Sequence, residues 1–324
     1  MMHPDVPKIR KIPAIVGVAF QGLGIAASIF GFIKLDQMLP ETYAGMVYAL
    51  FFVVVTFSLA AYILRIRLKK LHRYADIPPF THFVNHTIRN VLTRTRRKVE
   101  DGTFGEDDLE EMQIATVAML DAIARCFSIL TGSHCSVCIK ELQHGATPRV
   151  RVAYRDSISL ATRGADDGEH DPHEIDRDTP CEMAFKAGAG FGRGYICNNV
   201  KREWLRGRYK TESFIRYGGR EPSCVPFLGI PFVRNWKIHY NCTMVSPIRY
   251  RAFPVTSGKL LKSSGNKGPS GVRCWGFLCV DAKRRNLFVE ARHRDVLATF
   301  SDGLFVYFNE LHDIIDRYTD PGNS

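Results

Sequence analysis

The chain has 324 residues, of which 44 are Lys or Arg and 33 are Asp or Glu, so its formal net charge is +11. Such a basic chain suggests a nucleic-acid partner. The excess charge, however, lies beside strongly apolar segments, which argues against nucleic acid and for a membrane.

Two uncharged apolar segments lie near the start of the chain, at residues 12–33 and 42–64. A helix needs about 20 apolar residues to cross the hydrocarbon core of a bilayer, and both segments reach that length. A cleaved signal peptide is the alternative for the first segment, but it is long for one and a second apolar segment follows closely. Residues 1–66 are therefore predicted to form a transmembrane helical hairpin.

Basic residues follow the second segment. Ten Lys and Arg lie between Arg65 and Lys98, where Asp76 is the sole acidic residue, so this stretch supplies +9 of the +11. Basic residues next to a span stay in the cytoplasm and attract anionic lipids. We expect a multi-pass protein of the inner (cytoplasmic) membrane, with both termini and the remaining chain in the cytoplasm.

A helical connector is predicted at residues 67–105, interrupted at Pro78 and Pro79. From Phe80 to Val99 apolar residues recur every three or four positions, which is typical of an amphipathic helix. This apolar stripe has three possible positions: in a coiled coil with a second copy, against the folded domain, or on the lipid surface. The first would make the protein a homodimer.

The remaining residues, 106–324, are predicted to form one domain. Its expected elements, in chain order, are a helix from Asp107 or Asp108 to Gly132, strands at 134–142 and 149–156, a helix to Lys186 capped by Asp178-Thr179-Pro180, strands at 236–250 and 272–281, and a helix at 289–318. The region between Lys186 and Asn235 is long, aromatic and rich in glycine.

The last third of the chain carries the most specific pattern. An apolar strand at residues 240–248 ends in Pro-Ile, and its expected partner reads Trp-Gly-Phe-Leu-Cys-Val-Asp from Trp275 to Asp281. Phe288 and Asp295 then lead into the final helix. This order resembles the end of a GAF domain, and the resemblance extends over residues 107–318. A PAS-like sensor is the alternative fold, but it is usually shorter and lacks this ending.

The GAF resemblance implies an α+β fold, with an antiparallel sheet that has helices on one face and a ligand pocket on the other. Ligands of the family include cyclic nucleotides, tetrapyrroles, haem and small metabolites. The Asn-Lys…Phe…Asp-Glu signature of cyclic-nucleotide sensors is incomplete here, because Asn286, Phe288 and Asp295 lack its lysine and its spacing. A bilin-type Cys-His pair is also absent. The identity of the ligand and of any cofactor stays open.

Aromatic and basic side chains alternate between residues 185 and 236. Aromatic faces stack on planar ligands, and arginine binds phosphate or carboxylate with paired hydrogen bonds. The GAF resemblance implies that this segment covers the pocket, so a small anionic ligand is predicted. Alternatively, the aromatic residues fill the core and the basic residues are solvated. The predicted ligand-binding residues are Phe185, Arg193, Tyr195, Trp204, Tyr217, Trp236 and Cys242.

Metal sites are not predicted. Cys135 and Cys138 have the spacing of zinc ligands, but residues three apart on a strand point to opposite faces. His170 and His173 lie in an acidic segment with suitable ligands for a divalent cation, and we expect that segment to be solvated surface.

Three of the nine cysteines suggest a redox activity. All nine are expected to be reduced in the cytoplasm. Cys197, Cys224 and Cys242 are similar to the pocket cysteines of GAF-type methionine sulfoxide reductases, a chemistry that needs an exposed thiolate and a resolving cysteine.

The leading functional hypothesis is a non-enzymatic, membrane-anchored GAF sensor in bacterial signal transduction, without catalytic residues. It would signal through its connector and hairpin or to a partner protein. The first alternative is a nucleotide-activated, membrane-disrupting effector of a bacterial defence system. The second is the thiol-dependent methionine sulfoxide reductase.

Overall fold

The computed structural model describes residues 41–143, 148–163, 173–175, 178–189, 194–211, 223–227, 230–234, 238–249 and 274–319. The chain divides into two compact units, Met1–Lys69 and Lys70–Ser324. Most of the predicted connector therefore belongs to the second unit, together with the predicted sensor domain.

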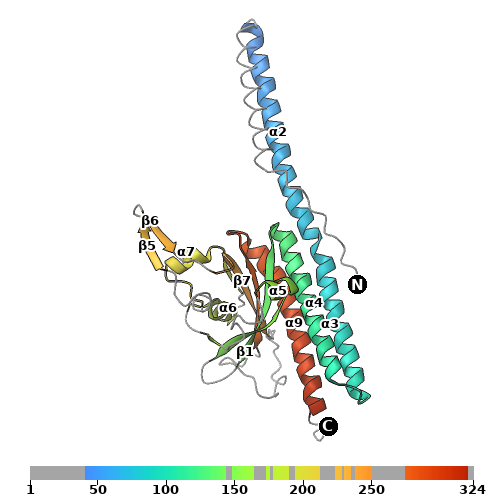
Figure 1. The fold of residues 1–324 in the computed structure, drawn as a ribbon. Helices are drawn as coiled ribbons and strands as arrows, with labels where there is room; N and C mark the ends of the chain where they lie inside the picture. Colours follow the sequence, from blue (N-terminus) through green and yellow to red (C-terminus); the bar gives the residue numbers. More distant parts are fainter. Residues whose placement is uncertain are drawn as a thin grey trace. The chain divides into compact units, whose positions relative to one another are not determined.

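Helix α2 (Glu41–Ala75) contains the second predicted apolar segment (Figure 1). Phe52, Val53, Val54 and Val55 are all exposed. Because successive helical residues point about 100° apart, this apolar surface surrounds the helix instead of forming one stripe. The first predicted segment, residues 12–33, lies outside the described residues.

Two helical stretches in the described part of the chain are long and apolar enough to cross a membrane. One begins at Tyr48 in α2, and the most apolar 18 residues have a mean hydropathy of 2.2 with none buried. The other is helix α4 (Glu106–Thr131), whose side chains Met119, Leu120 and Phe127 lie fully inside the domain. We therefore interpret α4 as a core helix and α2 as the candidate membrane helix.

Helix α3 (Ile77–Glu100) begins after a single interruption at Asp76. Pro78 and Pro79 lie in its first turn, where a backbone N–H has no partner in the helix anyway. The prolines therefore start this helix instead of separating two helices, which corrects the predicted boundary at Phe80.

The apolar stripe of α3 faces the domain. Val84 and Ile88 are buried, and α3 packs against α4 and helix α9 (Glu290–Thr319). Arg96 donates a hydrogen bond to the Glu310 carboxylate of α9 at 2.9 Å. Of the three positions open for the stripe, the structure shows docking on the folded domain.

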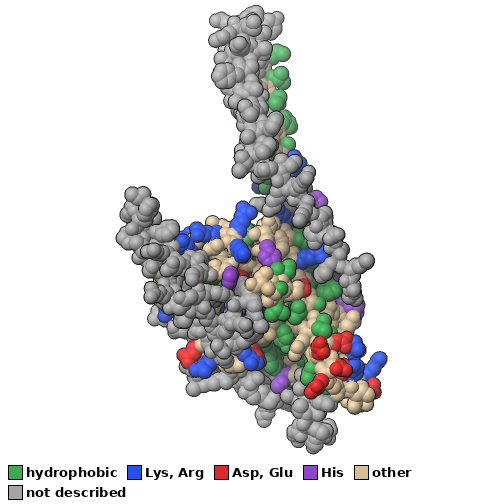
Figure 2. Space-filling model, viewed as in Figure 1, with side chains coloured by type: hydrophobic (Ala, Val, Ile, Leu, Met, Phe, Trp, Pro, Cys, Tyr) green, Lys and Arg blue, Asp and Glu red, His purple; other side chains and the backbone are tan. Residues whose placement is uncertain are grey.

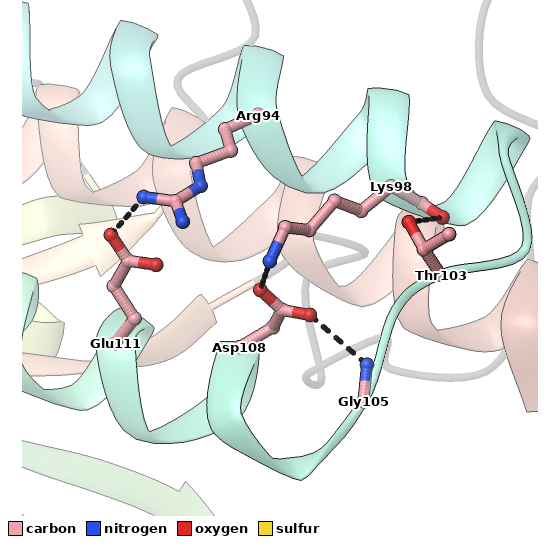
Figure 3. Close-up of polar contacts among 6 residues, drawn as sticks. All are labelled: Arg94, Lys98, Thr103, Gly105, Asp108 and Glu111. Atoms are coloured by element: carbon pink, nitrogen blue, oxygen red, sulfur yellow. Dashed lines mark hydrogen bonds and ion pairs between the residues drawn. The ribbon is translucent and has the colours of Figure 1, made fainter.

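Polar contacts join α3 to the start of α4 (Figure 3). Lys98 donates to the Asp108 carboxylate, which also accepts the Gly105 backbone N–H at 3.0 Å. The hydrogen bond from Lys98 lowers the pKa of Asp108. Arg94 pairs with Glu111 one turn further along. These contacts fix the corner between the two helices.

The central sheet has six strands in the order β3-β2-β1-β8-β7-β4, with every neighbouring pair antiparallel. Its strands are β1 (Cys135–Gln143), β2 (Arg149–Arg155), β3 (His173–Glu174), β4 (Tyr195–Cys197), β7 (Cys242–Arg249) and β8 (Cys274–Ala282). Strands β5 (Ser223–Phe227) and β6 (Ile230–Arg234) form a separate pair. Shorter helices are α5 (Ser157–Arg163), α6 (Pro180–Ala189) and α7 (Val200–Leu205).

The two faces of the sheet are covered differently (Figure 1). Helices α3, α4 and α9 lie on one side, over a large apolar core, and α6 lies on the other. We call the second side the α6 face. An α+β fold with helices on one face of an antiparallel sheet, as expected, is confirmed.

Close backbone packing explains the glycine of the Trp275–Asp281 pattern. A Cβ atom on Gly276 would lie 2.0 Å from the carbonyl oxygen of Lys140 on the neighbouring strand β1. Any larger residue would push β8 away from β1, so this position needs glycine.

Two predictions need correction. The strand predicted from Trp236 begins at Cys242, and residues 238–241 are not in a strand. No helix or strand was predicted between Lys186 and Asn235, where the structure has the short elements β4, α7, β5 and β6.

Candidate functional site

The candidate site is the α6 face of the sheet, and α6 itself is held by the predicted cap. Thr179 Oγ1 accepts the Glu182 backbone N–H at 3.3 Å, while the Glu182 carboxylate accepts the Asp178 N–H at 3.0 Å. This reciprocal pair satisfies the free N–H groups at the start of the helix. It holds α6 against strands β7 and β4.

Apolar side chains form most of the contact below α6. Ala184 is fully buried and Phe185 partly buried, and both pack in the same cluster as Val245 and Phe277. Burial of this area stabilises the position of α6 by roughly 25 cal/mol for each Å² of apolar surface.

A lysine interrupts this apolar face. Lys140 on β1 lies opposite Phe277 on β8 and opposite Val152 on β2, and both partners belong to the cluster below α6. Burial works against the charge of Lys140, yet the neighbouring thiols, Cys181 foremost, raise its pKa overall. Lys140 is therefore a half-buried cation on the face opposite the helices.

Tyrosine hydroxyls lie beside the lysine. The Tyr209 and Tyr240 hydroxyl oxygens are 3.1 Å apart, and Tyr240 interacts electrostatically with Asp281 and Lys140. Burial raises the pKa of both tyrosines, so they stay protonated, and because one donates to the other, the pair keeps one hydroxyl proton to donate. One cation with one hydroxyl donor suits an anionic group.

Three predicted ligand-binding residues lie on this side of the sheet. Phe185 is part of the cluster below α6, and Tyr195 packs both there and against the small cluster of Cys197, Val200 and Tyr209. Trp204 packs against the small cluster. Arg193, Tyr217 and Trp236 lie outside the described residues.

Cys242 is on the other face. It packs in the core between the sheet and the helices, and its thiol donates to the Arg284 carbonyl at 3.0 Å. Strand alternation explains this position, because Met244 on the same strand also faces the helices whereas Val245 faces α6. Cys242 is therefore separated by the sheet from Phe185 and Tyr195.

This placement also separates two cysteines of the reductase hypothesis. Burial raises the pKa of both Cys197 and Cys242, to about 12 for Cys242, so neither is a ready thiolate. Cys197 lies in the small cluster and Cys242 in the helix-side core. The side chain of Cys224 lies outside what the structure describes.

Cys135 and Cys138 point to opposite faces, as predicted. Cys135 packs in the helix-side core and Cys138 in the cluster below α6. In the described part of the chain, no three His, Cys, Asp or Glu side chains are arranged to hold a metal ion. His170 lies outside that part, and His173 begins the edge strand β3.

Neither the family models nor the curated proteins include a match to this chain. Among solved structures, the chain is similar to the GAF domain of an Acinetobacter phosphoenolpyruvate-protein phosphotransferase. The two share 14% sequence identity with a TM-score of 0.33, over 69% of this chain and 93% of that one. This similarity is low.

Several residues of the α6 face were not predicted as site residues from the sequence. Lys140 and Cys138 alternate along β1 on one face, a signal that period-two analysis could have found. No local sequence pattern marks Cys181 and Cys279 as neighbours, because only the fold brings Cys181 of α6 close to Cys279 of β8.

Proposed function

We propose that this chain is a membrane-anchored, non-enzymatic sensor of the GAF type, which binds a small anionic ligand on the α6 face. The observation that carries the proposal is Lys140, a charged side chain among the apolar groups below α6. The hydrogen-bonded pair of Tyr209 and Tyr240 supplies a hydroxyl donor, and Tyr240 interacts electrostatically with Lys140. The sheet with helices on one face supports the family resemblance drawn from the sequence.

The signal would pass from the α6 face through the sheet to α3. Strands β1 and β8 carry α6-face residues on one side and core residues on the other, and the same core holds Val84 and Ile88 of α3. A ligand shifts this arrangement only if it binds two states of the domain with different affinity. The receiver is either the membrane segment or a partner protein.

A thermal-shift experiment tests ligand binding. The full-length chain in detergent micelles is heated with cyclic and linear nucleotides, inorganic phosphate and small carboxylates. At least one anion should raise the melting temperature. Lys140→Gln should weaken that ligand's binding roughly 10- to 150-fold, because a charge-assisted hydrogen bond contributes about 1.5–3 kcal/mol.

Lys283→Gln is the matched control, because Lys283 is an exposed lysine just after β8. It should leave the shift unchanged. The ligand proposal is wrong if no anion stabilises the wild-type protein, or if both lysine variants respond equally.

The membrane anchor is proposed from the all-round apolar surface of α2. Together with residues 12–33, α2 would form the hairpin, and the Arg65–Lys98 stretch would hold the domain in the cytoplasm against anionic lipid. Arg94, Arg96 and Lys98 already pair with acidic groups of the domain. We therefore assign the lipid contact to the earlier part of the stretch, before residue 90.

Two valines of similar exposure provide the test. Val54 on α2 is 55% exposed and Val306 on α9 is 51% exposed. Val54→Arg should reduce retention in carbonate-washed membranes, since arginine at the centre of a span costs about 2.5–3.5 kcal/mol. Val306→Arg should change nothing. Equal retention of both variants would show that α2 does not anchor the protein.

A further inference from the structure

Three thiols meet on the α6 face. Cys138 of β1 and Cys279 of β8 are direct partners in the antiparallel register, and Cys181 lies in the first turn of α6 above them. Cys279 is hydrogen-bonded to both of the others. All three are buried, with 4–5% of each residue exposed. We call them the thiol trio.

The trio differs electrostatically from the other buried cysteines. The hydrogen bond with Cys279 lowers the pKa of Cys138 to about 7 and also lowers the pKa of Cys181, while it raises that of Cys279. Lys140 acts in the same direction on Cys138 and Cys181. Cys138 and Cys181 differ in this from five other cysteines, because burial raises the pKa of Cys126, Cys135, Cys197, Cys242 and Cys274.

Cys181 is the best placed thiolate of the three. It contributes the largest favourable electrostatic interaction of Lys140, ahead of Cys279 and Cys138. It also lies in the first turn of a ten-residue helix, where the helix dipole favours a negative charge. Cys279 keeps its proton and lies next to it, in the position of a resolving thiol.

We propose that the thiol trio is a redox site in which hydrogen peroxide oxidises Cys181 and Cys279 resolves it as a Cys181–Cys279 disulfide. This site shares Lys140 with the proposed ligand site, but its oxidation is measured without any ligand and does not depend on the membrane anchor.

The chemistry has two steps. The Cys181 thiolate attacks one peroxide oxygen, so that an S–O bond forms, the O–O bond breaks and hydroxide leaves to be protonated to water. Cys279 sulfur then attacks the sulfenic sulfur of Cys181: the S–S bond forms, the S–O bond breaks, and the departing hydroxide takes the Cys279 proton as a second water. Two thiols lose two electrons, and one peroxide gains them.

The disulfide would join helix and sheet. Without it, α6 is held on β8 by apolar packing and its cap, and with it one covalent bond ties the first turn of α6 to the central strand. Cys138 stays reduced beside the new bond.

Peroxide titration of the full-length chain in micelles tests the proposal. After treatment with hydrogen peroxide, free thiols are alkylated at low pH and the peptides are identified by mass spectrometry. Cys181 and Cys279 should be joined, reversibly with dithiothreitol, and at least roughly tenfold faster than Cys126 and Cys242 are oxidised in the same sample.

Single substitutions distinguish the roles of the three thiols and of Lys140. Cys181→Ser should abolish the disulfide, Cys279→Ser should leave a dimedone-reactive sulfenic acid on Cys181, and Cys138→Ser should retain the Cys181–Cys279 bond. Lys140→Gln should slow oxidation of Cys181, and Cys242→Ser should not. Tryptophan fluorescence checks that each variant is folded, and Cys181→Ala replaces any serine variant that is not.

Three results would overturn the proposal. One is a Cys138–Cys279 disulfide in place of the Cys181 bond. Another is oxidation of Cys126 and Cys242 as fast as that of the trio, which would indicate unfolding. The third is a fully reduced trio after Cys126 has been oxidised.

Discussion

Replacing Asp156 by alanine should destabilise the domain strongly, although the residue is far from the candidate site. Its side chain is 1% exposed and lies between β2 and α5. The carboxylate accepts the Val137 backbone N–H at 2.7 Å, the Ser159 N–H at 2.9 Å and the Ser159 hydroxyl at 2.6 Å. It therefore joins strand β1 to the start of α5.

The size of the effect follows from these three bonds. In Asp156→Ala, the N–H groups of Val137 and Ser159 lose their acceptor inside the protein. A buried polar group without a partner costs about 1–3 kcal/mol, and bonds to a charged acceptor are at the upper end of that range. We expect a loss of about 3–5 kcal/mol, which lowers the melting temperature by about 6–20 °C for a domain of this size.

Asp121 provides the matched control, because it accepts the Ser157 N–H at 2.7 Å and the Ser157 hydroxyl at 2.9 Å at an exposed position of the same helix start. Water can replace an exposed acceptor, so Asp121→Ala should cost less than about 1 kcal/mol. Tryptophan fluorescence during thermal unfolding of the full-length chain measures both, since all three tryptophans follow residue 200. Equal losses for both variants would refute the argument from burial.

Two further predictions concern the sheet and the start of α9. Gly276→Ala should destabilise the domain by about 3 kcal/mol in urea unfolding, because the added Cβ overlaps the Lys140 carbonyl; Gly303→Ala on α9, where a Cβ meets nothing closer than 3.4 Å, should be neutral or stabilising. Burial, assisted by Arg292, lowers the pKa of His293 to about 4, and its Nδ1 accepts the Val289 N–H at 3.0 Å. The unfolded state therefore binds the proton first as the pH falls, and stability should drop by about 3 kcal/mol between pH 6.5 and 4. His293→Gln should flatten that part of the wild-type pH curve, and an unchanged slope would exclude His293 as its cause.

Local signals predicted much of the domain. Gly132 ends α4 in a left-handed conformation, with a φ of 67°, as the sequence indicated. The Pro-Ile strand and the Trp275–Asp281 strand are paired neighbours, β7 and β8, as expected. These elements are defined by periodicity and capping, which act over a few residues and can be recognised without the fold.

The candidate site was harder to predict, because it depends on contacts between distant segments. Cys242 was grouped with Phe185 through the family resemblance, but one step of strand register decides which face a residue occupies. The thiol trio comes from β1, α6 and β8, and no spacing rule connects Cys138, Cys181 and Cys279. The start of α3 was predicted wrongly for a different reason. Proline interrupts a helix when it lies in the interior, but it is compatible with the first turn, where Pro78 and Pro79 lie.

The position of β8 in the sheet also determines when the domain can fold. Strand β8 lies between β1 and β7, and its partner residue Cys279 is 141 positions after Cys138 (279 − 138). During synthesis, β1 and β2 leave the ribosome as a hairpin, while the edge of β1 that β8 will cover stays unpaired until about 140 more residues have been made. Long-range pairing of this kind is slow, and unpaired strand edges are prone to aggregation. The α2 segment, in contrast, is synthesised before the first strand. The apolar helix can therefore form early, whereas the sheet is complete only after β8 has been synthesised.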